Sequence, residues 1–278
     1  MAIDYDKIMS LKSNDVEDSY TDNDTMLYAL GVGFGRDPLN RDELDFVYEK
    51  DLKTIPSMAT VIAWGAGHMR DSGINYLMVV HGEQRLKIYE PLPVAANILV
   101  DSRVTHVIDK GADKGALLVT EVDIKEKQTG KLLCTLGGTT FARGDGGFGG
   151  PKDGSPEPHQ IPDRKPDIIS ELDTTPDQAL LYRLSGDRNP LHSDLDVAEA
   201  AGFPRPILHG LCSYGTACRS IIKDVCKYDS SLIKQFDVRF SSPVFPGEKI
   251  STEIWVDGSD ISFRSWVKER NVMVINNG

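Results

Sequence analysis

A carboxylic acid and a histidine stand five residues apart in the segment YRLSGDRNPLH, residues 182–192. A carboxylate and an imidazole can together hold a water molecule and move its protons, because both titrate within range of neutral pH when partly buried. Asp187 and His192 are therefore candidate acid–base groups, and the amide of Asn189 could orient a neighbour or a ligand. These residue types are also common in loops, so a capping role for Asp187 and a packing role for His192 stay open as the alternative.

The backbone around these groups is predicted to be a loop between two helices. On one continuous helix, a spacing of five would place the two groups on different faces. Pro190 disfavours such a helix, so we expect residues 186–192 to form a loop. Residues 193–196 resemble a capping box that starts a short helix ending near Gly202. A loop held in this way can bring an acid, an amide and an imidazole to one point.

Gly210 is the second candidate for chemistry. Pro204 and Pro206 end the preceding element, and a helix of small residues begins near His209 and Gly210. A helix N-terminus offers unpaired N–H groups and the positive end of the dipole. Without a side chain, Gly210 lets a ligand carbonyl approach its N–H, as in an oxyanion hole. The alternative is that the glycine is there for tight packing. Taken together, however, the helix start at Gly210 and the acid–histidine pair favour a carbonyl-activating site.

Periodicity predicts the elements that position these residues. Apolar residues recur at spacings of three and four from Gly210 to Lys227, which indicates a helix with one apolar face. Strand patterns follow this helix and recur in the first half. The expected strands are residues 236–240, 249–256, 261–268 and 272–275 in the second half, and 85–89, 97–107, 116–124 and 132–141 in the first. A helix followed by several strands, found twice, indicates an α+β fold with antiparallel sheet.

The two halves of the chain resemble each other. YALGVGFGRDPL at residues 28–39 echoes YRLSGDRNPL at 182–191, and QRLKIYEPLP at 84–93 echoes DVRFSSPVFP at 237–246. The offsets, 154 and 153, are nearly equal, as a duplicated domain produces.

A glycine- and proline-rich segment, residues 144–166, separates the halves and favours an extended linker. No Gly-Lys-Ser/Thr follows its glycines, so it does not fit a phosphate-binding loop. We therefore divide the chain into an N-terminal repeat (1–143), a linker (144–166) and a C-terminal catalytic repeat (167–278).

The charge of the chain limits its partners. The 278 residues carry a formal net charge of −11 at pH 7. Because binding a phosphate backbone needs a basic surface, this charge argues against nucleic acid as a partner, though not against a small anionic ligand. There is no apolar run of roughly eighteen residues, which predicts no membrane span. No secretory signal and no Ser-Lys-Leu ending are visible, so we expect an intracellular protein, peroxisomal or cytoplasmic.

Cysteine and histidine usage points away from metal. The four cysteines form no CxxC pair, which is typical of reduced core cysteines in an intracellular protein. The six histidines form no HExxH arrangement, so we predict no metal site.

These motifs resemble a known family. YRLSGDRNPLH, followed by PILHGL at residues 206–211, is similar to the MaoC-like, (R)-specific enoyl-CoA hydratases (hydratase 2), including the hydratase region of peroxisomal multifunctional enzyme type 2. The resemblance extends through YALGVG (28–33), VVHGEQ (79–84), YEPLP, VIDKG (107–111) and GGFGG (146–150), and so covers nearly the whole chain.

The resemblance implies a double hot-dog fold, in which each half wraps an antiparallel sheet around a long helix. It implies reversible hydration of trans-2-enoyl-CoA to (3R)-3-hydroxyacyl-CoA in fatty acid β-oxidation, without a cofactor, by a homodimer. In that mechanism Asp187 and His192 hold one water, Asn189 is an active-site residue, and the Gly210 N–H binds the thioester oxygen. The implied ligand contacts are His81, Gly82, Lys110, Arg188, Pro190, Leu191 and Phe240, with Lys110 suited by charge to a CoA phosphate.

The first half departs from the catalytic pattern. In an ungapped alignment Asp187 faces Gly33 and His192 faces Pro38, and a shift of two residues places Asn40 opposite His192. Neither alignment restores the pair, so we expect the first half to be non-catalytic and to widen the groove for a long acyl chain.

Two other functions fit the same fold and ligand. An acyl-CoA thioesterase would direct water at the thioester carbon and usually lacks the Asp-x-Asn-x-x-His loop. A non-catalytic acyl-CoA-binding module is disfavoured by the intact set of Asp187, Asn189, His192 and Gly210.

Overall fold

The computed structural model describes residues 3–66 and 69–278, and within these ranges it contains ten strands. The strands of the first half are β1 (Lys12–Tyr20), β2 (Val79–Ile88), β3 (Ala96–Asp109), β4 (Ala116–Glu126) and β5 (Leu132–Ala142). Those of the second half are β6 (Ile168–Asp173), β7 (Val238–Phe240), β8 (Lys249–Asp257), β9 (Asp260–Val267) and β10 (Val272–Asn276).

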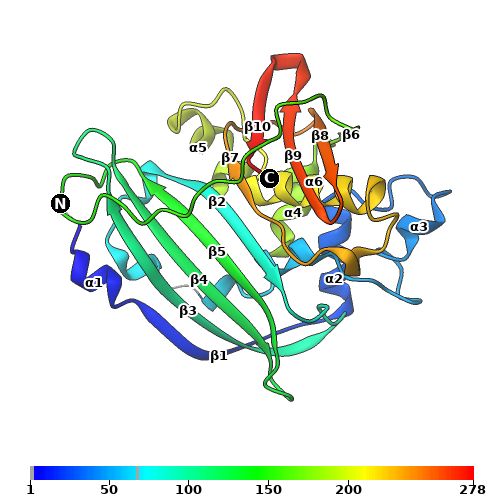
Figure 1. Ribbon diagram of the computed structural model, residues 1–278, viewed down its shortest axis with the longest axis horizontal. Helices are drawn as coiled ribbons and strands as arrows, with labels where there is room; N and C mark the ends of the chain where they lie inside the picture. Colours follow the sequence, from blue (N-terminus) through cyan, green and yellow to red (C-terminus); the bar gives the residue numbers. More distant parts are fainter. Residues whose placement is uncertain (1–2, 67–68) are drawn as a thin grey trace.

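All ten strands belong to one antiparallel sheet in the order β1-β3-β4-β5-β2-β7-β10-β9-β8-β6 (Figure 1). The order β1-β3-β4-β5-β2 in the first half recurs in the second as β6-β8-β9-β10-β7, so the two halves share one topology. They join where β2 meets β7, with Glu83 opposite Arg239 and Gln84 opposite Val238. This arrangement confirms the predicted α+β class and the double hot-dog fold.

The strands form because buried and exposed side chains alternate along them. In β3, which lies between β1 and β4, Ile98 and Val100 are fully buried, whereas the side chain of the preceding residue Asn97 is exposed. Such alternation places one face of the sheet against the core and the other toward solvent. The predicted strands of both halves are confirmed, with ends that shift by a few residues.

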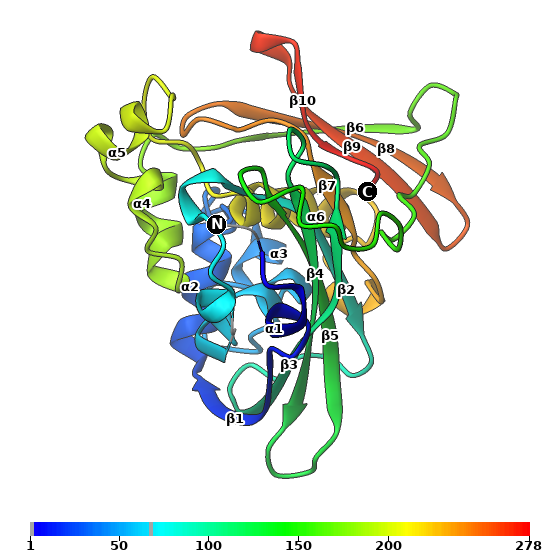
Figure 2. The ribbon, with the colours of Figure 1, turned by 90° about the vertical axis from the view of Figure 1, so that its left-hand side faces the viewer.

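The helices gather on one face of the sheet (Figure 2). They are α1 (Tyr5–Met9), α2 (Asp22–Gly31), α3 (Arg41–Leu44), α4 (Gln178–Tyr182), α5 (Leu195–Ala200) and α6 (Gly210–Asp224). Short 3-10 turns are η1 (Pro56–Thr60), η2 (Trp64–Ala66), η3 (Met69–Ser72), η4 (Tyr76–Met78), η5 (Arg183–Ser185), η6 (Pro190–His192), η7 (Ser230–Leu232) and η8 (Lys268–Arg270). No helix in these described parts of the chain is long and apolar enough to cross a membrane.

Helix α6 is the central helix of the second half. Every residue from Leu211 to Ile222 is buried, which explains why the helix is rich in small side chains. A Cβ added at Gly215 would lie 2.5 Å from the Val32 side chain, so the first half packs directly on this glycine. The predicted helix is confirmed, but it ends at Asp224 rather than Lys227, because Lys227 and the next residue adopt positive φ angles.

The first half departs from the expected long helix. The offset of 154 between the halves places residues 210–224 on residues 56–70, and there the described residues form the turns η1, η2 and η3. The β-branched residues 60–62 and Gly65 are poor helix formers, which accounts for the interruption. The first pair of echoing segments lies side by side: α2 packs against α4, with the Tyr28 and Tyr182 ring centroids 6.0 Å apart.

Candidate active site

Residues 186–189 form a loop as predicted, whereas residues 190–192 form the 3-10 turn η6. Gly186 has φ 138°, and a Cβ added there would lie 3.4 Å from Trp64, so this position requires glycine. The carboxylate of Asp187 accepts the N–H of Asn189 at 3.1 Å, and the side-chain oxygen of Asn189 accepts the N–H of Leu191 at 3.0 Å. Local capping therefore uses one carboxylate oxygen and the amide oxygen. The second carboxylate oxygen and the amide NH₂ group are left for other contacts.

His192 is buried and held in one tautomer. Its Nδ1 lies 2.9 Å from the carbonyl oxygen of Ile207, and because a carbonyl only accepts, Nδ1 carries the proton. The other nitrogen, Nε2, then has a free lone pair when the ring is neutral. Burial lowers the pKa of His192, against smaller opposing effects of the Ile207 bond and the Asp187 charge. A neutral imidazole with a free Nε2 is the form that can accept a proton from water.

His209 joins this site, although the sequence analysis assigned it no role. Its Nε2 donates to the carbonyl oxygen of Asp187 at 3.0 Å, and its ring stacks on His192 with centroids 3.7 Å apart. Burial and the neighbouring His192 lower the pKa of His209 to about 3. The available signal was its place directly before Gly210 in PILHGL. The direction of the ring could not be deduced from that position.

The three groups converge on one point. A carboxylate oxygen of Asp187 and one ring nitrogen each of His192 and His209 all lie within 4.8 Å of one another. A water with hydrogen bonds of about 2.6–3.2 Å can bridge two groups at this separation. Their types would also suit a cation, but each histidine already commits one nitrogen to a backbone carbonyl. The absence of a metal stays a prediction.

The N-terminus of α6 adjoins this cluster. His209 is the N-cap residue of the helix and makes no side-chain capping bond, so the first N–H groups of α6 have no side-chain acceptor from their own cap. Gly210 is the first helical residue, and the Phe240 ring packs on it, 3.5 Å from where a Cβ would lie. The structure therefore brings Asp187 and His192 together and places Gly210 at the start of the helix that follows His209.

Strand β2 brings His81 to the same side. The His81 ring lies 5.0 Å from Phe240, and the pairing of β2 with β5 is irregular between His81 and Glu83. Gly82 lies at this bulge, where a Cβ would meet the carbonyl of Thr139 at 3.1 Å. Burial lowers the pKa of His81 to about 4.

The other predicted ligand contacts lie at the rim of the loop. Arg188 and Pro190 are exposed and Leu191 is half-buried, so they are open to a ligand. Their contact with substrate stays a prediction.

Lys110 lies apart from the acid–histidine pair, at the exposed turn between β3 and β4. It borders an open hollow of about 550 Å³, whose other lining residues are Asp113, Lys114, Phe141 and Arg143. Phe141 pairs with Val80, the neighbour of His81, so the hollow lies at the His81 end of the first-half sheet. Three cationic side chains at one opening suit a phosphate-bearing group.

The residue before Lys110 anchors the glycine-rich segment. The Asp109 carboxylate accepts N–H groups from Gly111, Gly147 and Gly149 at 2.7–2.8 Å. These bonds lower the pKa of Asp109. The start of the predicted linker is thus bound to the turn that carries Lys110.

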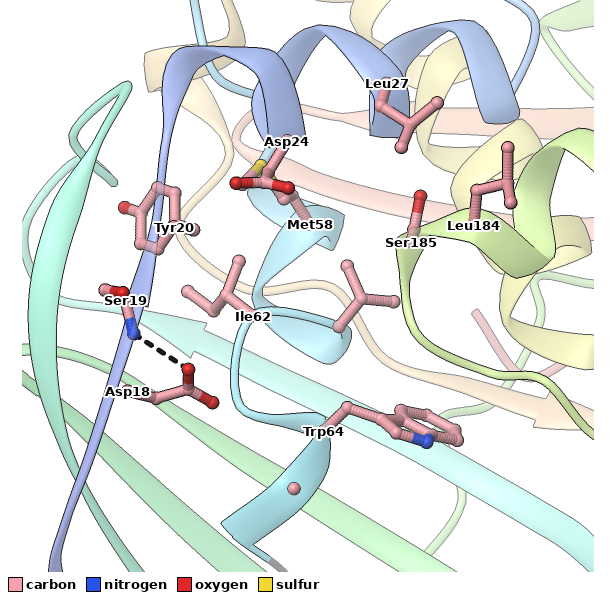
Figure 3. Close-up of a pocket in the computed structure, with 12 residues that line it drawn as sticks. Asp18, Ser19, Tyr20, Asp24, Leu27, Met58, Ile62, Trp64, Leu184 and Ser185 are labelled. Atoms are coloured by element: carbon pink, nitrogen blue, oxygen red, sulfur yellow. Dashed lines mark hydrogen bonds between the residues drawn. The ribbon is translucent and has the colours of Figure 1, made fainter.

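A second cavity, of about 150 Å³, lies between the two halves (Figure 3). Its lining residues are Asp18, Ser19, Tyr20, Asp24, Leu27, Met58, Val61, Ile62, Trp64, Gly65, Leu184 and Ser185. Ile62 and Trp64 come from the segment where the first half lacks a long helix, and Ser185 is two residues before Asp187. The interrupted helix therefore leaves a partly apolar space next to the loop that carries Asp187.

Comparison with known proteins agrees with this geometry. Residues 19–144 match the MFE-2 hydratase 2 N-terminal domain, and residues 158–278 match the MaoC like domain. The chain is 40% identical to the peroxisomal enoyl-CoA hydratase 2 of Arabidopsis thaliana, over 97% of this chain and 93% of that protein. It is also 40% identical to the 3-hydroxyacyl-thioester dehydratase Y of Mycobacterium tuberculosis, over 85% of this chain and 82% of that protein.

A solved structure gives the same result. The crystal structure of a MaoC-like dehydratase from Phytophthora capsici superposes with a TM-score of 0.86 at 32% identity, covering 99% of this chain and 96% of the other. With its fold, its loop and its relatives over nearly the full length, the chain belongs to the MaoC-like hydratase 2 family.

Proposed function

We propose that this protein is an (R)-specific enoyl-CoA hydratase, which adds water reversibly to trans-2-enoyl-CoA to give (3R)-3-hydroxyacyl-CoA in fatty acid β-oxidation. One observation carries the assignment of the site. The Asp187 carboxylate lies within 4.8 Å of a buried His192 ring nitrogen, and His209, which completes this cluster, directly precedes the N-terminus of α6. The full-length relatives named as a hydratase and a thioester dehydratase support the two directions of this reaction.

Asp187 and His192 activate one water. The free Nε2 of His192 accepts a proton as the water oxygen bonds to C3 of the enoyl group, and Asp187 holds the same water. The proton that His192 accepted is then delivered to C2, so one water supplies both the hydroxyl and the hydrogen of the new C–H bond, and His192 returns to its neutral form. Reversal of these steps dehydrates the hydroxyacyl thioester.

Gly210 stabilises the charge that develops meanwhile. Attack at C3 pushes electrons through C2 onto the thioester oxygen, which becomes enolate-like. The N–H of Gly210 at the start of α6 donates to this oxygen, and the missing side chain allows the approach. Asn189 contributes its NH₂ group to the site.

The remaining contacts hold the two ends of the substrate. His81, Gly82 and Phe240 flank the thioester region, and Arg188, Pro190 and Leu191 form its rim. Lys110 in its cationic hollow contacts a CoA phosphate. The reaction needs no cofactor, since CoA is part of the substrate.

The first half binds the acyl chain and does no chemistry. Gly33, Gly35 and Pro38 provide no acid–base pair, and the Asn40 oxygen caps α3. The cavity in Figure 3 takes the acyl chain, with Ile62 in its wall. An Ile62→Phe variant should therefore lose activity on long chains while keeping it on crotonyl-CoA. Equal losses on both substrates would contradict this role.

We further propose that the protein forms a homodimer. We also propose a peroxisomal location, which the name of the Arabidopsis relative supports. Size-exclusion chromatography with light scattering tests the first point. Imaging of the tagged full-length protein in its own cells tests the second.

The hydratase assignment is tested with trans-2-decenoyl-CoA. Loss of the conjugated enoyl-thioester absorbance without release of free CoA is the expected result. Free CoA as the product would favour an acyl-CoA thioesterase. Binding without turnover would favour a non-catalytic acyl-CoA-binding module.

A further inference from the structure

The side chain of His209 does not do what its position suggests. It is the N-cap residue of α6, yet it makes no capping bond to the helix. It is 1% exposed, and its Nε2–H donates instead to the backbone carbonyl of Asp187, 22 residues earlier in the chain. Because Nε2 holds the proton, a neutral ring leaves Nδ1 bare, and Nδ1 is buried without a hydrogen-bond partner. A buried nitrogen without a partner costs free energy, so the ring is kept there against a penalty.

His209 also contacts the other end of the catalytic loop. Its ring stacks on His192, with centroids 3.7 Å apart and planes 28° apart, and Tyr182 lies on it at 5.0 Å. His192 in turn donates to Ile207, two residues before His209. The segment of residues 207–209 therefore holds Asp187 at one end of the loop and His192 at the other.

The next residue is Gly210. Asp187 and His192 belong to one loop and the Gly210 N–H belongs to α6, so no covalent geometry fixes their relative positions. His209 is covalently bonded to Gly210, donates to the backbone carbonyl of Asp187 and stacks on the ring of His192. His209 therefore links the Asp187–His192 pair directly to the residue whose N–H is the proposed oxyanion donor.

We propose that His209 is a positioning residue, whose neutral imidazole sets the distance between the Asp187–His192 pair and the Gly210 N–H. This inference rests on the proposed hydratase function. In this role His209 acts through Asp187 and His192 and not directly on the water or the substrate. Its hydrogen bond to the Asp187 carbonyl fixes the backbone that carries the carboxylate, and its stacking sets the plane of the His192 ring.

Such a residue affects the chemical step more than binding. Displacement of a catalytic group by about 1 Å can cost about 100-fold in rate, because the reacting atoms leave attack geometry. Ground-state binding of the CoA ester depends on other contacts. Loss of His209 should therefore lower kcat and leave KM nearly unchanged.

Two substitutions separate the hydrogen bond from the ring. His209→Gln keeps a side-chain N–H donor near the position of Nε2, whereas His209→Phe keeps an aromatic ring without a donor. With trans-2-decenoyl-CoA we expect about 100-fold lower kcat for H209F, a loss within about tenfold for H209Q, and KM within about twofold for both. In an Asp187→Asn background, H209F should add little further loss, because its effect passes through Asp187.

Folding is checked by thermal unfolding and by the Kd for decanoyl-CoA, which cannot be hydrated. Wild-type kcat in H209F would overturn the proposal, as would a raised KM at unchanged kcat or full additivity with D187N. Failure of both variants to fold would give His209 a purely structural role and also overturn it. The assay of the wild-type protein alone tests the proposed function. If the wild type does not hydrate enoyl-CoA, the proposed function fails, whereas the comparison of variants tests only the role of His209.

Discussion

The ring of Phe240 packs so closely on Gly210 that a Cβ added to the glycine would lie 3.5 Å from the nearest ring carbon. That distance is an ordinary van der Waals contact, and Gly210 has no positive φ, so the fold tolerates alanine there. In the proposed mechanism, the methyl group would obstruct the approach of the thioester oxygen to the Gly210 N–H. We predict that Gly210→Ala lowers kcat/KM by about 10²–10³-fold, comparable to losing an oxyanion donor.

The melting temperature of Gly210→Ala should stay within a few degrees of the wild type. Steady-state kinetics and calorimetry check both parts. Normal kinetics in the folded variant would remove Gly210 from the oxyanion role.

His192→Gln tests the base. The variant lacks a nitrogen that accepts a proton from water, so we expect kcat to fall by about 10²–10⁴-fold. His106, an exposed histidine on β3, supplies the matched control, since His106→Gln should leave kcat unchanged. Comparable activity in the two variants would show that His192 is not the base.

Stability should depend on pH through the buried histidines. Burial lowers the pKa of His81 to about 4 and of His209 to about 3, and it also lowers that of His192. Below about pH 6.5, the pKa of histidine in the unfolded chain, the unfolded chain binds protons that the folded chain does not. The free energy of unfolding therefore decreases as the pH decreases.

The effect is absent above about pH 7 and grows between about pH 6.5 and 4, by up to about 1.4 kcal/mol per pH unit for each group. Urea unfolding at pH 7.5, 6 and 5 measures it, with H209Q expected to show a shallower slope. A free energy of unfolding that rises as the pH falls through this window would be inconsistent with buried neutral histidines.

Asp109→Asn should loosen the glycine-rich segment. The carboxylate accepts three backbone N–H groups, and an amide would present its NH₂ to one of them. We predict a loss of about 1–3 kcal/mol in the free energy of unfolding and faster proteolysis within residues 144–166. Asp113, exposed on the same turn, is the control, because Asp113→Asn should change neither quantity. Equal behaviour of the two variants would mean that the bonds at Asp109 contribute nothing.

Individual elements show which parts of the fold are predictable from the sequence and which are not. The helix at 210–224 and most strands were predictable because apolar side chains recur with a period that the fold keeps. Strand β1 was missed because KSNDVEDSY, at the edge of the sheet, has few apolar residues to alternate. The interrupted helix in the first half was missed because the repeat implied a helix and local propensity opposed it.

The candidate site also has features that the sequence predicts and features that it does not. The loop of Asp187 and His192 and the helix start at Gly210 were predictable, since Pro190 and Gly210 have direct consequences for the backbone. The contacts of His209 and Asp109 were not, because they join residues 22 and up to 40 positions apart. Only the tertiary structure decides which backbone groups such side chains reach.

The central claim is that Asp187 acts in a stereospecific hydratase, and the most direct test is dehydration of the two 3-hydroxydecanoyl-CoA epimers. The wild-type protein should convert only the (3R) epimer to trans-2-decenoyl-CoA. D187N should convert neither, although it binds decanoyl-CoA as the wild type does. Consumption of the (3S) epimer by the wild type, or substantial turnover by a folded D187N, would contradict the account.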